Sequence, residues 1–479
     1  MPDSDPDTAL IACNRFGLGA RPGDIGKVAA DPRGFLKAEL RQPDIALISL
    51  DAPAGAALTG STAAIEASMA AARQRELDKG RVAVPPGAPP QPAAPLPPKP
   101  DPGVEARLFR AEAEARFDKA LSVEAGFVER LVYFWSNHFC VSVAKHPYVR
   151  AAAGAFEREA IRPFVLGRFA DMLLAVERHP AMLVYLDNQQ SIGPDSRAGQ
   201  NGRRGLNENL GREILELHTL GVGGGYTQAD VTTLARLLTG WTVAGREGRL
   251  GEPGSFVFEA AAHEPGEEVL LGRTYPAGGM GQAEAALNDI AAQPATARHI
   301  ALKLARHFIA DDPPPTAVAR LAKVFAASGG NLRAVAATLV DMPEAWKTPM
   351  TKMRSPLDYV VAIRRATHAG PAGDADLAKE TGQSLGWLAA LGEPLWQVPG
   401  PNGFSDAVDA QASPEGMKVR LDIAWQAARQ VKDIANPAAT LDAVVGASAS
   451  PQTRAAIAKA ESKQQGLALL LMAPEFQRR

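Results

Sequence analysis

Residues 206–231, with the sequence LNENLGREILELHTLGVGGGYTQADV, contain two helical patterns separated by a run of glycines. At about 100° per residue, the apolar side chains of the first pattern gather on one face and the charged side chains on another. Gly221 is placed to end the first helix, and Thr227 with Asp230 forms a capping box that begins the second. The segment therefore predicts two helices joined by a short turn.

The same helical periodicity continues through most of the chain, whereas strict two-residue alternation is scarce. We therefore expect an all-α fold, a large multihelical domain with at most one short β-hairpin, formed by residues 255–258 and 268–271. The expected helices are 6–15, 34–41, 63–78, 104–121, 125–143, 149–159, 164–178, 206–220, 227–238, 281–291, 295–309, 316–328, 331–339, 356–367, 374–391, 414–431 and 453–471.

Composition narrows the function classes. The chain has 479 residues and a formal net charge of only -2, so nothing in its overall charge favours nucleic acid or an anionic membrane as a partner. Two cysteines, Cys13 and Cys140, cannot form a disulfide framework and match no zinc-ligand spacing. No apolar run approaches the roughly 18 residues that span a bilayer. The opening MPDSDPDTAL lacks the features of a signal peptide, which predicts a soluble, cytoplasmic chain.

A proline-dense segment divides the chain. Residues 82–103 read VAVPPGAPPQPAAPLPPKPDPG, and proline fixes φ and removes backbone donors, so neither helix nor sheet can continue through them. We expect residues 1–54 to form an N-terminal helical part of the core and residues 55–119 an inserted arm of two helices joined by this linker. Residues 120–479 then form the main core. This division predicts that the arm can be deleted without unfolding the core.

The first helix of residues 206–231 carries closely spaced carboxylates. Glu213 and Glu216 lie one turn apart with Arg212 beside Glu216, and an arginine keeps one acid ionised while the other retains its proton. This pattern predicts Glu213, Glu216 and Arg212 as catalytic residues in a cleft. The pattern equally fits a solvated face, with i, i+4 pairs of Arg212 to Glu208 and Glu216 that each stabilise by about 0.3 kcal/mol. Both interpretations stay open.

Further polar side chains are candidates for lining this cleft. The candidate binding residues are Glu208, Asn207, Asn137, Asn188 and His218. Asn137 shares a helical face with Tyr133, whereas the loop position of Asn188 also fits a polar cap. His218 lies away from the two acids on the helix, so its spacing is unsuited to a metal site and favours a hydrogen-bonded core histidine.

Other histidines have structural explanations. His138 shares a helical face with Leu131, Phe134 and Trp135, which predicts a core histidine and not a metal ligand. A second helix carries basic side chains at helical spacing, which predicts a solvated basic face. These side chains are His299, Lys303, Arg306 and His307.

Several long motifs occur together and in a fixed order. They are NRFGLGARPGDI, FWSNHF, PAMLVYLDN, NENLGREILELHTLGV, GGYTQADV, LTGW, RHIALKLARHFIAD, KMRSPLDYVV and LGEPLWQVPGPNGFSDAVDA. With these motifs the chain resembles the bacterial domain-of-unknown-function family numbered 1800, almost from end to end. The resemblance assigns no activity. Because members of the family often carry export signals, the resemblance implies export. It also implies a sulfatase-like or phosphatase-like companion protein. This chain departs from the family pattern at His263-Glu264, where His-Asp is expected, and at Gln411, where tryptophan is usual.

Two functions are compatible with these patterns. The first is a hydrolase of glycosidic or related polymer substrates that uses the paired carboxylates of residues 206–220, with a polysaccharide as its binding partner. The alternative is a non-catalytic binding or maturation partner of an exported sulfatase-like or phosphatase-like protein, which would place the chain in the periplasm or outside the cell. No sequence pattern indicates which cofactor, if any, the chain uses.

Overall fold

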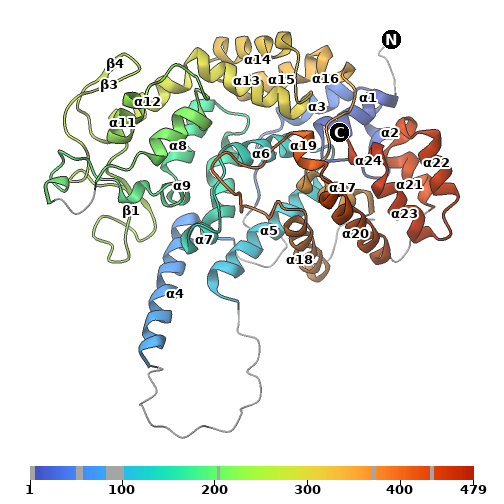
Figure 1. The fold of residues 1–479 in the computed structure, drawn as a ribbon, viewed down its shortest axis with the longest axis horizontal. Helices are drawn as coiled ribbons and strands as arrows, with labels where there is room; N and C mark the ends of the chain where they lie inside the picture. Colours follow the sequence, from blue (N-terminus) through green and yellow to red (C-terminus); the bar gives the residue numbers. More distant parts are fainter. Residues whose placement is uncertain (1–5, 50–57, 82–101, 202–204, 368–373, 432–435) are drawn as a thin grey trace, which may run out of the picture.

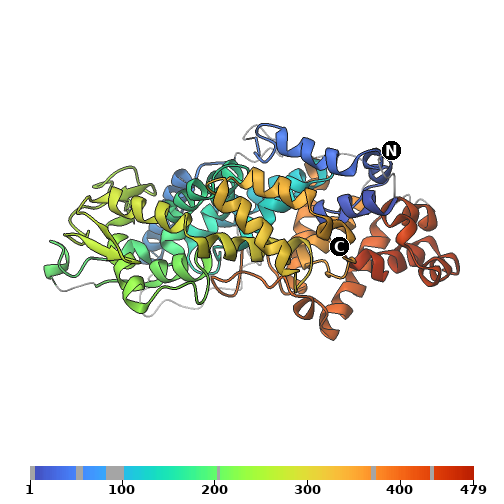
Figure 2. The ribbon, with the colours of Figure 1, turned by 90° about the horizontal axis from the view of Figure 1, so that it is seen from above.

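The computed structural model describes residues 6–49, 58–81, 102–201, 205–367, 374–431 and 436–479 (Figure 1). Over these residues the fold is all-α, as the periodicity predicts, with two small antiparallel sheets. Helices α8 to α12 and the strands form one end of an elongated body, and α20 to α24 form the other (Figures 1 and 2).

The first half of the body contains α1 Pro6–Ile11, α2 Asp24–Val28, α3 Pro32–Arg41, α4 Ser61–Arg81, α5 Val104–Ser122, α6 Phe127–His138, α7 Pro147–Phe156, α8 Phe169–Arg178, α9 Pro180–Tyr185, α10 Asn209–Glu213 and α11 Gln228–Leu237. The second half contains α12 Met280–Ala291, α13 Pro294–Phe308, α14 Pro315–Ala327, α15 Leu332–Asp341, α16 Pro343–Lys347, α17 Pro356–Thr367, α18 Asp374–Ala390, α19 Val408–Gln411, α20 Pro414–Gln430, α21 Pro437–Val444, α22 Pro451–Ala458, α23 Lys463–Met472 and α24 Pro474–Gln477. Three π-helices, η1 Ala12–Phe16, η2 Glu157–Ile161 and η6 Ile214–His218, continue α1, α7 and α10. Short 3-10 helices are η3 Arg162–Phe164, η4 Asn188–Gln190, η5 Gly199–Asn201 and η7 Gly446–Ser448.

The strands pair differently from the predicted hairpin. Both predicted stretches contain a strand, but β2 (Phe256–Phe258) pairs with β1 (Trp241–Val243), and β3 (Glu268–Leu270) pairs with β4 (Arg273–Tyr275). The connection of β3 to β4 is Leu271-Gly272, and both residues have positive φ, 51° and 76°. Positive φ at both central positions gives a tight hairpin turn, so β3 folds back on the next strand and leaves β2 for β1.

Several short helices were not expected from the periodicity, including α9, α16, α21 and α24. Each of them begins with a proline at its first position. Proline fits there because its missing N–H would have no intrahelical partner, so it marks the start of a helix that is too short to show a periodic pattern.

Helix α6 occupies the core. Ten of its twelve residues are buried, including the charged Glu129 and Arg130. A helix that is buried on nearly all sides needs partners for its charges. Glu129 bonds to Arg162 at 2.6 and 2.8 Å, and Arg130 bonds to Asp358 at 3.0 Å.

Helices α4 and α5 project from the body as a pair (Figure 1). Their inner halves nevertheless belong to the core, because Ile65 of α4 and Ala113 of α5 are fully buried. Arg116 of α5 forms a buried ion pair with Glu157 at 2.9 Å. Most of the predicted linker, residues 82–103, lies outside the described residues. The domain boundaries stay a prediction, but the burial does not support a separable arm.

Candidate functional site

The helix that carries the paired carboxylates changes its geometry half-way. Helix α10 ends at Glu213, and a π-helix follows over Ile214–His218. A π-helix turns by less per residue than an α-helix, so positions assigned at 100° per residue are wrong beyond Glu213. Arg212 bonds to Glu208 at 3.0 Å. Within the described part of the chain it forms no ion pair with Glu216, contrary to the predicted series of pairs.

Glu213 and Glu216 are each partly exposed. Neither carboxylate has a hydrogen-bond or ion-pair partner among the residues that the structure describes. Burial raises the pKa of Glu213, and the nearby His218 lowers it. Their catalytic role stays a prediction.

Three of the candidate binding residues fix the local backbone and its neighbours. Glu208 accepts hydrogen bonds from Thr232 at 2.7 Å and Gln228 at 2.9 Å. Asn207 accepts one from the backbone N–H of Asn209 at 2.9 Å. Asn188 is buried and donates to the carbonyl oxygens of Leu238 at 3.2 Å and Trp241 at 3.0 Å, which ties its loop to β1.

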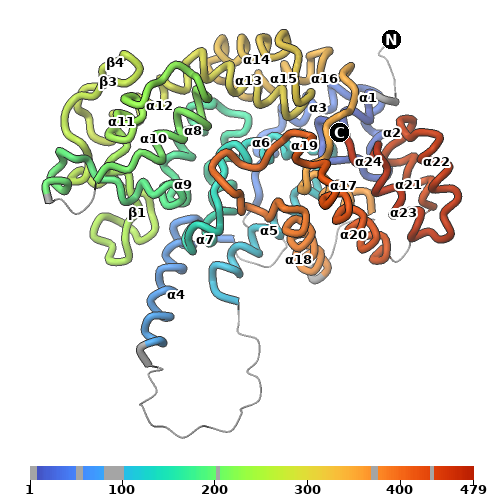
Figure 3. Tube along the Cα trace, in the orientation of Figure 1, coloured from blue at the N-terminus to red at the C-terminus, as the bar shows by residue number. Residues whose placement is uncertain are grey.

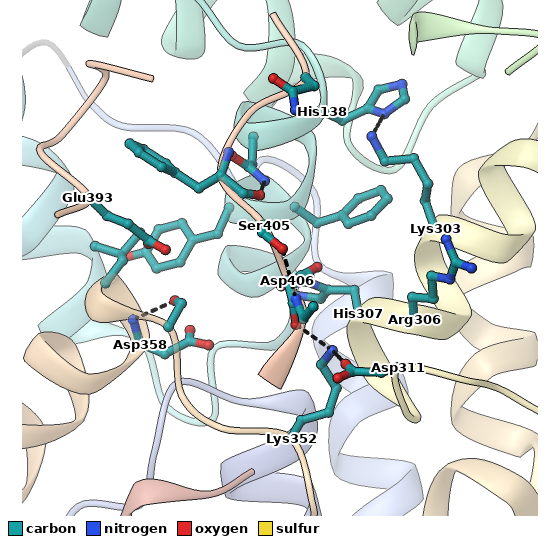
Figure 4. Close-up of a pocket in the computed structure, with 18 residues that line it drawn as sticks. His138, Lys303, Arg306, His307, Asp311, Lys352, Asp358, Glu393, Ser405 and Asp406 are labelled. Atoms are coloured by element: carbon teal, nitrogen blue, oxygen red, sulfur yellow. Dashed lines mark hydrogen bonds and ion pairs between the residues drawn. The ribbon is translucent and has the colours of Figure 1, made fainter. Parts of the chain in front are cut away.

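A cavity of about 500 Å³ lies beside α6. Asn137 lines it, whereas Glu213 and Glu216 do not. The other lining side chains come from segments far apart in the sequence, and Figure 4 shows them together. They include His138, Lys303, Arg306, His307, Asp311, Lys352, Asp358, Glu393, Ser405 and Asp406. Four of the sequence motifs therefore meet at this cavity: FWSNHF, RHIALKLARHFIAD, KMRSPLDYVV and LGEPLWQVPGPNGFSDAVDA.

Asn137 holds the loop that forms one wall. The chain between α18 and α19 returns across α6 (Figure 3). There Asn137 donates to the carbonyl oxygen of Phe404 at 2.9 Å and accepts from its N–H at 2.8 Å. Gly403 has a φ of 76°, and a Cβ atom at this position would overlap the Asn137 carbonyl oxygen. The Asn-Gly-Phe sequence therefore lets the loop approach α6 closely and brings Asp406 to the cavity.

His138 is a buried core histidine, as its helical face predicts. Its Nε2–H donates to the carbonyl oxygen of His218 at 3.1 Å, and its Nδ1 accepts from the Lys303 ammonium at 2.8 Å. His218 in turn donates from Nδ1 to Glu177 at 2.8 Å. Burial and the charge of Lys303 hold the pKa of His138 well below its usual value, so the ring is neutral.

Asp406 is an ionised carboxylate in the cavity. Its Oδ2 accepts from His307 Nδ1 at 2.7 Å, and Arg479 lies 3.6 Å from its Oδ1. His307 and Arg479 hold the pKa of Asp406 well below its usual range. Burial lowers the pKa of His307. The predicted solvated face of α13 is wrong at this residue, because His307 is buried and lines the cavity.

Glu393 is another acid that lines the cavity, and its pKa shifts in the opposite direction to that of Asp406. Burial raises its pKa to about 7, and the charges of Asp358 and Asp406 contribute in the same direction. Gln411 donates to its Oε1 at 2.8 Å. Glu393 thus retains its proton over much of the range in which Asp406 is ionised.

The motifs that meet at this cavity belong to one family. The family described as a protein of unknown function (DUF1800) matches residues 11–478. The chain belongs to the DUF1800 family. No curated protein and no solved structure matches the chain.

The sequence patterns do not predict Glu393 and Asp406 as site residues of this DUF1800 cavity. Glu393 lies in the quoted motif LGEPLW and has no second acid at helical spacing, whereas Asp406 lies in PNGFSDA and has Asp409 three residues later. Neither spacing indicates that Glu393 and Asp406 meet. The available signal was the motif order itself, which marked these segments without showing that they meet. Over the described residues no group of three or more His, Cys, Asp or Glu side chains forms a metal-ligand set, and no helix has the length and apolar character of a membrane span.

Proposed function

We propose that this DUF1800 chain is a hydrolase of glycosidic or related polymer substrates whose reaction centre is the cavity beside α6. The observation that carries the proposal is that two acids with different partners line one cavity. Glu393 accepts from the neutral amide of Gln411 at 2.8 Å, and burial raises its pKa. Asp406 accepts from His307 at 2.7 Å and lies 3.6 Å from Arg479, and these groups lower its pKa. Environments that separate the pKa values of two acids create a proton donor and a proton acceptor at one pH. This pair replaces Glu213 and Glu216 as the leading candidate.

Each acid has one role in the proposed reaction. Asp406 accepts a proton from a water molecule, which attacks the carbon of the scissile bond and forms a new C–O bond. Glu393 donates its proton to the leaving oxygen as the original C–O bond breaks. The proton on Asp406 then returns through solvent to Glu393. His307 is a positioning residue, because its Nδ1–H keeps Asp406 ionised and oriented.

The remaining lining supports a hydroxyl-rich substrate. Ser355, Asn402 and Ser405 offer polar groups, and Tyr133 and Phe404 offer rings. A cavity of about 500 Å³ fits a ligand of a few sugar units.

A hydrolysis screen tests this function. The purified chain is incubated with a panel of polysaccharides and of sulfate and phosphate esters, and new reducing ends, sulfate and phosphate are measured. We expect cleavage of at least one substrate, and a fall of about a hundredfold or more in Glu393→Gln and Asp406→Asn. The exposed acids Asp409 and Glu415 provide matched controls, Asp409→Asn and Glu415→Gln, that retain the activity.

Two results would overturn the proposal. One is a cleaved substrate for which Glu393→Gln and Asp406→Asn remain as active as the controls. The other is a polysaccharide that binds without being cleaved, which would favour the non-catalytic binding partner.

A further inference from the structure

Two cations line the cavity without a carboxylate partner. Lys303 and Arg306 lie three residues apart on α13 and both face the cavity (Figure 4). Lys303 is bonded to His138 Nδ1 at 2.8 Å. Over the described ranges, neither cation forms an ion pair.

The other charges of the cavity are already neutralised. Lys352 lies 2.5 Å from Asp311 and also donates to the carbonyl oxygen of Asp406 at 2.7 Å. Asp358 is bonded to Arg130 at 3.0 Å. Asp406 accepts from His307 at 2.7 Å and lies 3.6 Å from Arg479, and its charge also raises the pKa of Lys303 in opposition to burial. Among the described residues, Lys303 and Arg306 are therefore the lining cations that have no ion-pair partner.

The surroundings of Lys303 hold its ammonium in place without cancelling its charge. His138 is neutral and can accept one N–H, and its other nitrogen is committed to the carbonyl oxygen of His218. Two N–H donors of Lys303 remain for a ligand. A cation that is largely removed from water is costly when it has no counterion, and burial lowers the pKa of Lys303 accordingly.

We infer that Lys303 and Arg306 form a subsite for an oxyanion substituent, a carboxylate or a sulfate, on the sugar unit that enters the cavity. The ammonium and the guanidinium offer charge-assisted hydrogen bonds to such a group. The identity of the substrate as a polymer of anionic sugars rests on the proposed function, whereas binding of the anionic sugar itself does not.

The test measures binding in the absence of turnover. Glucuronate, glucose 6-sulfate and neutral glucose are compared on the full chain by ligand-observed NMR titration at constant ionic strength. We expect at least one anionic sugar to bind about tenfold or more tightly than glucose. Tighter binding of glucuronate identifies the substituent as a carboxylate, and tighter binding of glucose 6-sulfate identifies it as a sulfate. Equal binding of all three sugars, or binding of none, would overturn the subsite.

Variants separate a local site from general charge. Lys303→Met with Arg306→Gln should reduce binding of the anionic sugar to the level of glucose. Arg306→Gln alone, at an exposed position that cannot disturb the core, should weaken it severalfold. Arg320 and Lys323, also three residues apart and exposed on α14, provide a control with the same charge change, Arg320→Gln with Lys323→Met. An equal loss in this control would contradict the subsite.

The subsite and the proposed function can fail separately. Glu393→Gln should still bind the anionic sugar, since it leaves both cations unchanged. If the protein binds the anionic sugar but cleaves no substrate, the subsite is supported and the hydrolase proposal is overturned. If the protein cleaves only neutral polymers, the hydrolase proposal is supported and the subsite is overturned.

Discussion

Gln411 links Glu393 to the loop that carries Asp406: its side-chain amide donates to Glu393 Oε1 at 2.8 Å and to the carbonyl oxygen of Ser405, the neighbour of Asp406, at 3.1 Å. The same position is one of the departures of this chain from the family pattern. An amide that donates to a carboxylate favours its ionised form, and Gln411 lowers the pKa of Glu393 in opposition to burial.

Replacing Gln411 should therefore raise the pKa of Glu393 further. We expect Gln411→Leu to move the Glu393 titration above about 7. The measurement is a pH titration of the Glu393 carboxyl carbon by NMR, with the signal assigned from Glu393→Gln. An unchanged or lower midpoint in Gln411→Leu would show that this hydrogen bond does not control the acid.

Glu393 should also make stability depend on pH. Its pKa is raised in the folded protein from the usual 4.5 to about 7, so the folded state binds the proton more tightly. This contribution is fully present below pH 4.5 and is lost as the pH rises through about 7, a difference of up to about 3 kcal/mol. Urea denaturation at pH 5 and pH 8 should show a smaller difference for Glu393→Gln than for the parent or Glu415→Gln. Identical pH dependence of stability in all three proteins would disprove the raised pKa of Glu393.

Gly403 should be intolerant of a side chain. Gly403→Ala places a Cβ atom against the Asn137 carbonyl oxygen and also forces alanine to a φ of 76°. Gly392 has a φ of 84° and open space around it, so Gly392→Ala carries the backbone penalty alone, about 1 kcal/mol. We expect Gly403→Ala to lower the free energy of unfolding by at least about 1 kcal/mol more than Gly392→Ala. Equal losses would mean that the close approach to α6 is not required.

Deletion of residues 55–119 should unfold the protein, in contrast to the expectation from the sequence. The deletion removes Arg116 from the buried Glu157 and removes Ala113 from the core. Breaking a buried ion pair from one side costs about 3–5 kcal/mol before the lost packing is added. Circular dichroism and thermal melting of the deleted chain measure the outcome. A soluble deletion variant with a cooperative melt near that of the parent would restore the separable arm.

The fold class follows from the sequence because buried helical faces repeat every three to four residues, and this periodicity is local. The π-helix after Glu213 cannot be predicted in this way, because a helical wheel assumes a constant rotation per residue. The cavity could not be predicted for a different reason. Asn137, Glu393 and Asp406 meet only through the tertiary fold, and no spacing within one segment records their proximity. For Lys303, helical spacing correctly predicts that it shares a face of α13 with Arg306 and His307. The predicted solvated environment is wrong, because this face lines the cavity.

The position of the reaction centre is tested by comparing the two acid pairs on the first polymer that the parent chain cleaves. Initial rates are measured for Glu393→Gln, Asp406→Asn, Glu213→Gln and Glu216→Gln, with folding of each variant checked by its thermal melt. If the cavity is the reaction centre, we expect rates about a hundredfold or more below the parent for the first two variants, and rates within about twofold of the parent for the last two. Loss of activity in Glu213→Gln or Glu216→Gln, with full activity in Glu393→Gln and Asp406→Asn, would contradict this expectation and place the reaction at the π-helix.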